Sequence, residues 1–303
     1  MAEVIVIGGA NVDVKGRPAA SLIAGTSNPG EVVTSVGGVG RNIAHNLALL
    51  GVDTALLAMV GDDGNGRLIV EETRKAGVDV SLLQSVPGHS GIYLALLDDK
   101  GELIAAINDM RCADRMTPGH LAVHHDRFAA ASLVVADCNL PKSCLAWLFD
   151  FTRKAGIRLL IEPVSVPKVR KLLGLEPSAF AITPNAAQLE ALTGTADEIE
   201  ALNKLHAMGF RNIVVHRGRG GALASDGTSQ PVQIPAHGAQ AIRDVTGAGD
   251  ASVAGLVCGL VAGLDLATAA RMGQAAASLK LQSAESVAAS LNRVSLFALA
   301  GIT

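Results

Sequence analysis

The chain has 303 residues, of which 49% are hydrophobic and 3% aromatic, and a formal net charge of −3. One large α/β domain suits this length and composition, and the lack of a Lys/Arg cluster argues against nucleic acid as a partner. The longest apolar run, 251–264, is too short to cross a membrane, so no membrane partner is expected.

The amino-terminal residues lack the basic and then apolar pattern of a signal peptide, and the four cysteines lack CxxC pairing or metal-ligand spacing. We therefore expect a cytoplasmic protein.

Short apolar runs of the buried-strand type alternate with helical patterns along the chain. Strands are predicted over 3–8, 55–60, 132–136, 158–161, 179–183 and 212–216, and helices over 42–51, 68–76, 143–155, 186–192 and 198–208. From residue 250 onward the pattern is mostly helical. Strands that alternate with helices in this way predict a mostly parallel sheet covered on both faces.

Two segments interrupt this alternation. Residues 14–36 hold prolines and glycines among short β-like pieces, and residues 90–110 alternate apolar and polar residues on either side of a turn at 98–101, which is typical of a hairpin. We expect both segments to form one small sheet that projects from a single domain of residues 1–303, as a candidate lid. An extension that serves only as an oligomer contact is the alternative, and the two roles are compatible.

The stretch 244–250, Asp-Val-Thr-Gly-Ala-Gly-Asp, is the most informative motif. Its glycines allow close approach of the backbone to a ligand, and the helix predicted behind it would direct unpaired N–H groups at one spot, which suits a phosphate. Asp250 adds a carboxylate that can accept a proton from an attacking hydroxyl. A Gly-rich turn followed by Asp is also an ordinary helix start. The functional interpretation is phosphoryl transfer to an alcohol.

Polar residues also follow the predicted strands. Asn11 and Asp13 come after the first strand, where a carboxylate could accept from two sugar hydroxyls, although Asp13 could equally terminate the strand. A second glycine loop, 37–42, leads into a helix and brings Asn42, unless it is a plain loop-to-helix junction. Later strands end in polar residues at 137–139, 162–165, 183–185 and 216–221. Such ends share one edge of a parallel sheet, which predicts a common cleft.

Together, in this order and spacing, these motifs resemble the ribokinase-like (PfkB) family of carbohydrate and nucleoside kinases over essentially the whole chain. The resemblance implies a three-layer α/β/α fold with a β lid, and transfer of phosphate from ATP, with Mg²⁺, to a primary hydroxyl. It implies Asp250 as catalytic base and Gly247, Ala248 and Gly249 as the anion hole. Acceptor-binding positions would be Asn11, Asp13, Gly38 and Asn42, and nucleotide-binding positions Asn185, His216, Gly218, Gly221 and Thr246.

The resemblance also implies a monovalent cation such as K⁺ near the anion hole, where Asp244 begins the loop, and a homodimer formed through the lid. One position departs from the family pattern Asn-x-x-Glu, because Gln188 stands where the acid belongs, three residues after Asn185. Mg²⁺ prefers carboxylates and water. We therefore expect Asn185 and Gln188 to act on Mg²⁺ through bound water, and Mg²⁺ affinity to be lower.

Further segments resemble the pseudouridine kinase branch of the family, namely 9–16, 27–30, 37–44, 108–110, 137–140 and 162–165. This implies phosphorylation of the 5′-hydroxyl of a C-nucleoside, with Asn139 and Asp109 in contact with the acceptor. Asp109, Ser27 and Asn28 could lie over the base or could be simple turn residues of the lid. A kinase for another nucleoside or sugar, of ribose, adenosine or fructose type, and a non-catalytic ligand-sensing member of the fold are the alternatives.

Overall fold

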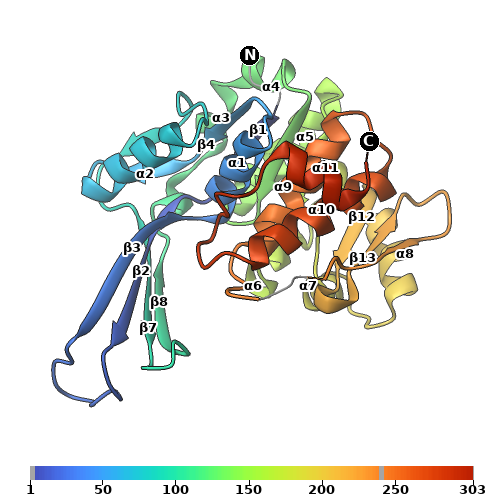
Figure 1. The fold of residues 1–303 in the computed structure, drawn as a ribbon. Coiled ribbons are helices and arrows are strands. Elements are labelled where there is room, and N and C mark those ends of the chain that lie inside the picture. The colour runs from blue at the N-terminus through green and yellow to red at the C-terminus, as the bar shows by residue number, and fades with distance from the viewer. Residues whose placement is uncertain (1–3, 239–241, 303) are drawn as a thin grey trace.

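The computed structural model describes residues 4–238 and 242–302 (Figure 1). Its main sheet has eight strands in the order β14-β13-β12-β11-β10-β9-β1-β4. The parallel strands are β1 (Val4–Ile7), β4 (Thr54–Leu57), β9 (Leu133–Asp137), β10 (Leu159–Glu162), β11 (Ala179–Ile182) and β12 (Phe210–His216). At one edge, β13 (Ala222–Ser225) and β14 (Val232–Ile234) are antiparallel. The strands expected from apolar runs are therefore confirmed, whereas the antiparallel edge was not predicted.

Helices cover both faces of this sheet, because alternate residues of each strand enter two separate hydrophobic cores. In β1, Val4 and Val6 pack in one core, and Ile5 and Ile7 pack in the other. The first core includes residues of α1 (Val39–Leu49), α2 (Gly64–Lys75), α9 (Ala248–Val261), α10 (Leu266–Leu281) and α11 (Arg293–Ala300). The second includes residues of α3 (Pro118–Ala122), α4 (His125–Ala129), α5 (Lys142–Ala155), α6 (Val166–Val169), α7 (Ala186–Thr193) and α8 (Glu198–Met208). The three-layer α/β/α fold is confirmed.

One strand expected from the sequence divides into two in the structure. The strand expected over 55–60 splits into β4 and β5 (Met59–Gly61), and β5 pairs with β6 (Gln84–Val86) in a separate two-stranded sheet. Glu3, where the first strand was expected to begin, lies outside the described residues. Within the described ranges, no helix is both long and apolar enough to cross a membrane.

Helices α9 and α10 pack closely because small residues line their contact. A Cβ at Gly255 of α9 would lie 2.6 Å from the carbonyl oxygen of Met272 in α10, so only glycine allows this approach. The apolar run that the sequence predicts as a buried core helix is therefore α9, which is buried from Ala251 to Leu260. This packing fixes the position of the residues at its amino-terminal end.

A second sheet of four strands, in the order β3-β2-β7-β8, projects from the body of the molecule (Figure 1). It consists of β2 (Asn11–Pro18), β3 (Gly30–Gly37), β7 (Gly91–Leu97) and β8 (Leu103–Asp109). The hairpin expected within 90–110 is present as β7 and β8, and the other interrupting segment pairs beside it. A role as a lid stays a prediction.

The sheet starts earlier than residue 14, where the candidate lid was expected to begin. Asn11 and Asp13 belong to β2 of the second sheet and do not end the first strand of the main sheet. The reason is the segment Gly8–Ala10, which separates β2 from β1 and lets the chain cross from one sheet to the other.

Candidate active site

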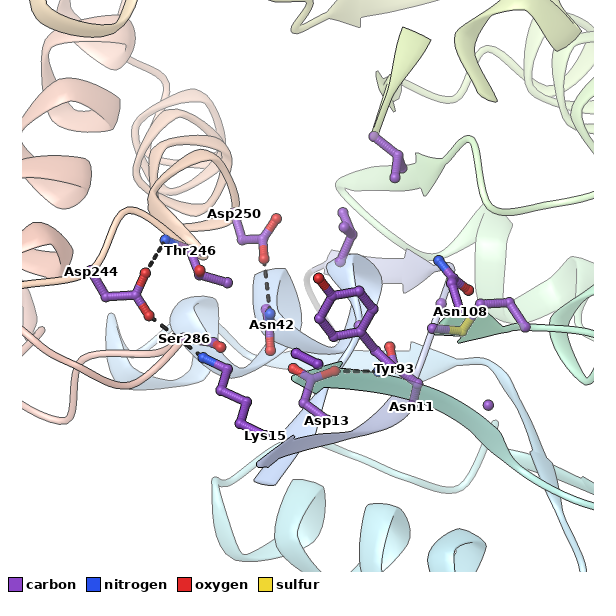
Figure 2. Close-up of a pocket in the computed structure, with 18 of the residues that line it drawn as sticks. Asn11, Asp13, Lys15, Asn42, Tyr93, Asn108, Asp244, Thr246, Asp250 and Ser286 are labelled. Carbon is purple, nitrogen blue, oxygen red and sulfur yellow. Dashed lines mark hydrogen bonds and ion pairs between the residues drawn. The ribbon is translucent and has the colours of Figure 1, made fainter. Parts of the chain in front are cut away.

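A cavity of about 890 Å³ lies between the second sheet, the carboxyl edge of the main sheet and the 244–250 turn (Figure 2). Ligand sites commonly have this size, and open α/β sheets bind ligands at this edge. The structure brings a subset of the sequence-predicted residues together there. Those that line the cavity are Asn11, Asp13, Gly38, Asn42, Asn139, Thr246, Gly247 and Asp250.

Asp250 lies in the first turn of α9, with its carboxylate directed into the cavity (Figure 2). Its Oδ2 accepts a hydrogen bond of 2.9 Å from Nδ2 of Asn42, which lies in α1. The N-cap of α9 is Gly247, and no side chain caps this helix, so the carboxylate does not serve the helix start.

The pKa of Asp250 is raised to about 7, chiefly by burial and also by the charges of Asp137 and Asp13. The hydrogen bond from Asn42 and the charge of Lys280 oppose this shift. A carboxylate with a pKa near the working pH is well matched to a general base.

The turn before α9 depends on glycine at position 247. Gly247 has φ 81°, and a Cβ there would lie 2.0 Å from the carbonyl oxygen of Ser286. The Ala248 amide already donates to the Val245 carbonyl at 3.2 Å. In the part of the chain that the structure describes, the amides of Gly249 and Asp250 have no hydrogen-bond partner, as expected for the first turn of a helix. These two N–H groups are thus the ones available to an anion.

Asp244 shapes the start of the same turn. Its Oδ1 accepts from the Thr246 amide at 2.8 Å, and its Oδ2 lies 3.6 Å from Nζ of Lys15 in β2 (Figure 2). The ion pair connects the second sheet to the anion-hole turn. Lys15 also lines the cavity, where its charge would favour a phosphate.

The second sheet contributes a polar row to the cavity. Strand register places Asp13 of β2 beside Tyr93 of β7, and Tyr93 beside Asn108 of β8. Neighbouring residues in register share a face of the sheet, and all three line the cavity. Asn11 Nδ2 donates to Asp13 Oδ1 at 2.6 Å, which leaves the carboxylate able to accept from further hydroxyls.

This register also places Asp109 away from the cavity. Because side chains alternate between the faces of a strand, Asn108 points inward and its neighbour Asp109 does not. The Asp109 carboxylate pairs instead with Arg111, with Nε at 2.9 Å, and lines an adjoining pocket. That pocket shares Asn108, Met110, Asn139 and Lys168 with the main cavity. Asp109 therefore does not line the main cavity, whereas Asn108 does, and contact of Asp109 with the acceptor stays a prediction.

The polar residues at the strand ends meet at one edge of the sheet, but the side chains of Asp137 and Glu162 accept hydrogen bonds from backbone amides there. Asp137 is fully buried, and its Oδ2 accepts from the Gly9 amide at 2.9 Å. A Cβ at Gly8 would lie 2.2 Å from the same oxygen, which explains the glycine pair after β1. Asn139, two residues on, lines the cavity and receives a hydrogen bond from Lys168 Nζ to its Oδ1.

Glu162 is the second buried acid of this edge. Its Oε1 accepts from the Val164 amide at 3.1 Å, and its Oε2 accepts from Thr183 Oγ1 at 2.5 Å. The pKa of Glu162 is raised to about 8, chiefly by burial and also by the charges of Asp250 and Asp137, against the hydrogen bonds from Thr183 and Val164. Val164 has φ 67°, a strained conformation for a β-branched residue, and it lines the cavity.

The remaining predicted residues lie outside this cavity. Asn185 and Gln188 cap α7 reciprocally, because each side-chain oxygen accepts from the other residue's amide, at 2.9 and 2.8 Å. Asn185 is bridged to His216 across β11 and β12. Burial lowers the pKa of His216 to about 4, so its ring is neutral, and its buried Nε2 lacks a partner among the described residues.

Gly218 and Gly221 follow β12 at the same edge of the sheet, and both have positive φ. Ala248 and Gly249 belong to the first turn of α9 without lining the cavity itself. The nucleotide roles of these residues stay predictions.

Sequence reasoning missed several lining residues, above all Tyr93, Lys15, Asn108 and Lys168. Tyr93 carried a usable signal, because it is the only tyrosine of the chain and occupies an alternating segment. The others required the strand register, which the sequence does not supply.

Comparisons with known proteins agree with this geometry. Residues 1–292 match the pfkB family carbohydrate kinase. A pseudouridine kinase of Escherichia coli (strain K12) is 37% identical over 289 residues, covering 92% of this chain and 90% of that relative. A carbohydrate kinase from Agrobacterium tumefaciens has a similar structure, with TM-score 0.88 and 30% identity, covering 100% of this chain and 98% of that chain. Arabidopsis thaliana ribokinase complexed with ribose and ATP is similar in fold, with TM-score 0.85, 23% identity and coverage of 100% and 99%.

Proposed function

The chain belongs to the pfkB family of carbohydrate kinases and is a phosphotransferase with an alcohol acceptor, and from this premise we propose that it phosphorylates the 5′-hydroxyl of pseudouridine with ATP. The relative named as a pseudouridine kinase supports the choice of acceptor. One observation carries the proposal: the Asp250 carboxylate, whose pKa is raised, and the polar row of Asp13, Tyr93 and Asn108 face one cavity.

The acceptor would lie along the second sheet. Asn11 and Asp13 would bind ribose hydroxyls, and Asn42 would direct Asp250 toward the 5′-hydroxyl. Tyr93 offers a ring for stacking on the base, and Asn108 and Asn139 offer amides for its N–H and carbonyl groups. An acceptor that combines a sugar with a polar flat base uses all of these groups. A free sugar would leave the Tyr93 end unused.

Asp250 would accept the proton of the 5′-hydroxyl as the oxygen attacks the γ-phosphorus of ATP, while the bond from that phosphorus to the β,γ-bridging oxygen breaks and ADP leaves. The Gly249 and Asp250 amides and the positive end of the α9 dipole would stabilise the transferring phosphoryl group. Lys15 supplies a positive charge on the opposite side of the turn. Phosphoryl transfer depends mainly on such positioning and electrostatics.

ATP would enter from the side of Gly218 and Gly221, with its phosphates reaching Thr246 and Gly249. His216 and Asn185 lie at the same edge, as a bridged pair. The described residues contain no group of three or more His, Cys, Asp or Glu side chains suited to a metal ion. The residues therefore fit Mg²⁺ only as the ATP complex with most of its water retained, oriented by Asn185 and Gln188. When bound, Mg²⁺ would neutralise charge on the phosphates.

A coupled assay of ADP release tests the acceptor, with pseudouridine, uridine, ribose, adenosine and a fructose phosphate compared under the same conditions. We expect the highest kcat/KM with pseudouridine. A clear preference for ribose or adenosine would replace the proposed acceptor with another sugar or nucleoside. No turnover on any of them, with nucleoside binding retained, would instead favour the ligand-sensing alternative.

Asp250→Asn tests the base. The amide keeps the size of the side chain, so we expect an intact fold and a loss of roughly 10²–10⁴ in kcat, the usual contribution of a general base. Near-normal turnover in this variant would remove Asp250 from the mechanism.

We also propose that the protein is a homodimer formed through the second sheet. The outward face of this sheet carries exposed apolar side chains, including Val32 (69% exposed) in β3 and Ile107 (67% exposed) in β8, both edge strands. Exposed apolar edge strands favour pairing with another sheet. Sedimentation of the wild type and of Ile107→Lys would test this, since the variant should be monomeric. We place the protein in the cytoplasm, in agreement with its sequence.

A further inference from the structure

Lys280, near the carboxyl end of α10, is fully buried, with 0% of its surface exposed. Its ammonium donates to the backbone carbonyl of Asp244 at 2.8 Å and lies 3.5 Å from the carbonyl of Ser283. Among the described residues, it forms no ion pair within 4.0 Å with a carboxylate. Burial of a lysine against neutral carbonyls is costly, because the charge loses its water without gaining a full counter-charge.

The two carbonyls belong to the two loops that shape the anion hole. Asp244 begins the turn that leads to α9, and Ser283 begins the loop that follows α10. The two loops touch where Gly247 packs against the carbonyl of Ser286. The Arg243 amide also donates to the Leu281 carbonyl at 2.8 Å. Lys280 therefore lies behind the anion-hole turn and connects the loop that begins at Asp244 with the loop that begins at Ser283.

The electrostatic surroundings agree with a positioning role. Burial lowers the pKa of Lys280, the charges of Asp244 and Asp250 raise it, and the charge of Lys15 lowers it. The carboxyl end of a helix favours a cation. The same positive charge lowers the pKa of Asp250 and so favours the basic form of that carboxylate.

We propose that the Lys280 ammonium is the built-in monovalent cation of the anion-hole loop, which makes this enzyme independent of K⁺. The family resemblance implies a monovalent cation beside this loop, but the backbone oxygens that the loop offers at Asp244 and Ser283 already face Nζ of Lys280. A second cation at the same place would meet a fixed positive charge. K⁺ therefore does not fit here, and Lys280 is a positioning residue for the turn.

The first test compares the wild type in potassium, sodium and tetramethylammonium chloride at equal ionic strength, so that screening is the same. Thermal unfolding without substrate is one readout, and ADP release is the other. We expect the unfolding temperature to be unchanged and kcat/KM to agree within about twofold among the salts. The unfolding readout does not depend on the acceptor, so it stands even if the proposed function is wrong.

Two substitutions of Lys280 distinguish the effect of its charge from the effect of its side-chain volume. Lys280→Ala opens room for a hydrated ion beside the carbonyls, and Lys280→Met fills that room without charge. We expect both to lose about tenfold or more of kcat/KM in tetramethylammonium, the equivalent of one charge-assisted hydrogen bond. K⁺ should restore activity and raise the unfolding temperature in Lys280→Ala alone. Arg271→Met is the matched control, because it removes an exposed charge from the same helix.

Specific activation or thermal stabilisation of the wild type by K⁺ would overturn the proposal. A folded Lys280→Ala protein that keeps wild-type activity in tetramethylammonium would also overturn it. The same holds if Lys280→Ala and Lys280→Met respond equally to K⁺. If both variants fail to fold, the wild-type salt comparison decides the question by itself. A wild type that is inactive on pseudouridine in every salt, with a K⁺-specific rise in the unfolding temperature of Lys280→Ala, would support the cation role and count against the proposed acceptor.

Discussion

Two glycines of the anion-hole turn should respond in opposite ways to the same added methyl group. Gly249 is the second residue of α9 and faces open space, with no atom within 4 Å of an added Cβ. Alanine is favoured over glycine in helices, so Gly249→Ala should raise stability by about 0.5 kcal/mol, or about 1–2 °C in Tm. The new methyl group would stand where the Gly249 and Asp250 amides meet the phosphate. We therefore expect kcat to fall by about 10²-fold, the usual effect of losing one such donor.

Gly247→Ala, in contrast, should lower the stability of the folded protein. Its φ of 81° costs alanine about 1–2 kcal/mol. The added Cβ, 2.0 Å from the Ser286 carbonyl oxygen, also forces the two loops apart. We expect a total loss of about 2–4 kcal/mol, with a fall in Tm of about 4–8 °C.

Differential scanning fluorimetry and the ADP-release assay measure both effects on the same preparations. Gly64→Ala is the matched control, since Gly64 is a first-turn glycine of α2 whose added Cβ meets nothing closer than 3.9 Å. It should leave turnover unchanged. A stable Gly249→Ala protein with wild-type kcat would refute the placement of the phosphate at this turn.

Four further predictions concern the site. The kcat/KM profile should fall tenfold for each unit of pH below about 7, because Asp250, with a pKa of about 7, must be deprotonated to act as base; a flat profile between pH 5.5 and 7.5 would contradict this. The same raised pKa means that the folded state holds a proton that the unfolded state releases near 3.8, so stability is lost as pH rises through 7. Asp250→Asn should therefore be more heat-stable than the wild type at pH 8, and equal or lower stability of the variant at that pH would count against a raised pKa of Asp250. Gln188→Glu should lower the Mg²⁺ concentration required for half-maximal activity without unfolding the protein, because glutamate serves equally in the capping box of α7; an unchanged Mg²⁺ titration would show that position 188 does not act on the metal. Tyr93→Leu should reduce kcat/KM for pseudouridine by about fivefold and leave that for ribose unchanged, since stacking contributes about 1 kcal/mol; an equal loss for both acceptors would exclude base recognition by this ring.

Much of the fold was predictable because the parallel strands are buried on both faces. Such strands appear as continuous apolar runs, and those at 132–136 and 158–161 lie within one residue of β9 and β10. The antiparallel strands β13 and β14 are only four and three residues long, and β14 is mostly exposed, so their apolar signal is weak. The split of the 55–60 run into β4 and β5 depends on which neighbour each half pairs with, and that is a tertiary matter.

The candidate site likewise contains residues that the sequence could identify and residues that it could not. Local sequence identified Asp250, Gly247, Asn42 and Asp13, because glycine turns and polar residues at strand ends are local features. It did not point to Asn108, which lines the cavity, since the two faces of a strand cannot be told apart until its partner is known.

By itself, the sequence determined the chemistry at hand: a phosphate-binding turn, a carboxylate behind it and polar residues at the ends of parallel strands. Only the tertiary structure decided how these groups act on one another. The pKa of Asp250 depends on burial and on Asp137 and Asp13, which are distant in the chain. The place of Lys280 behind the turn depends on the packing of α10 against α9. The strength of a charge is set by the dielectric and the charges around it, and these exist only when the chain is folded.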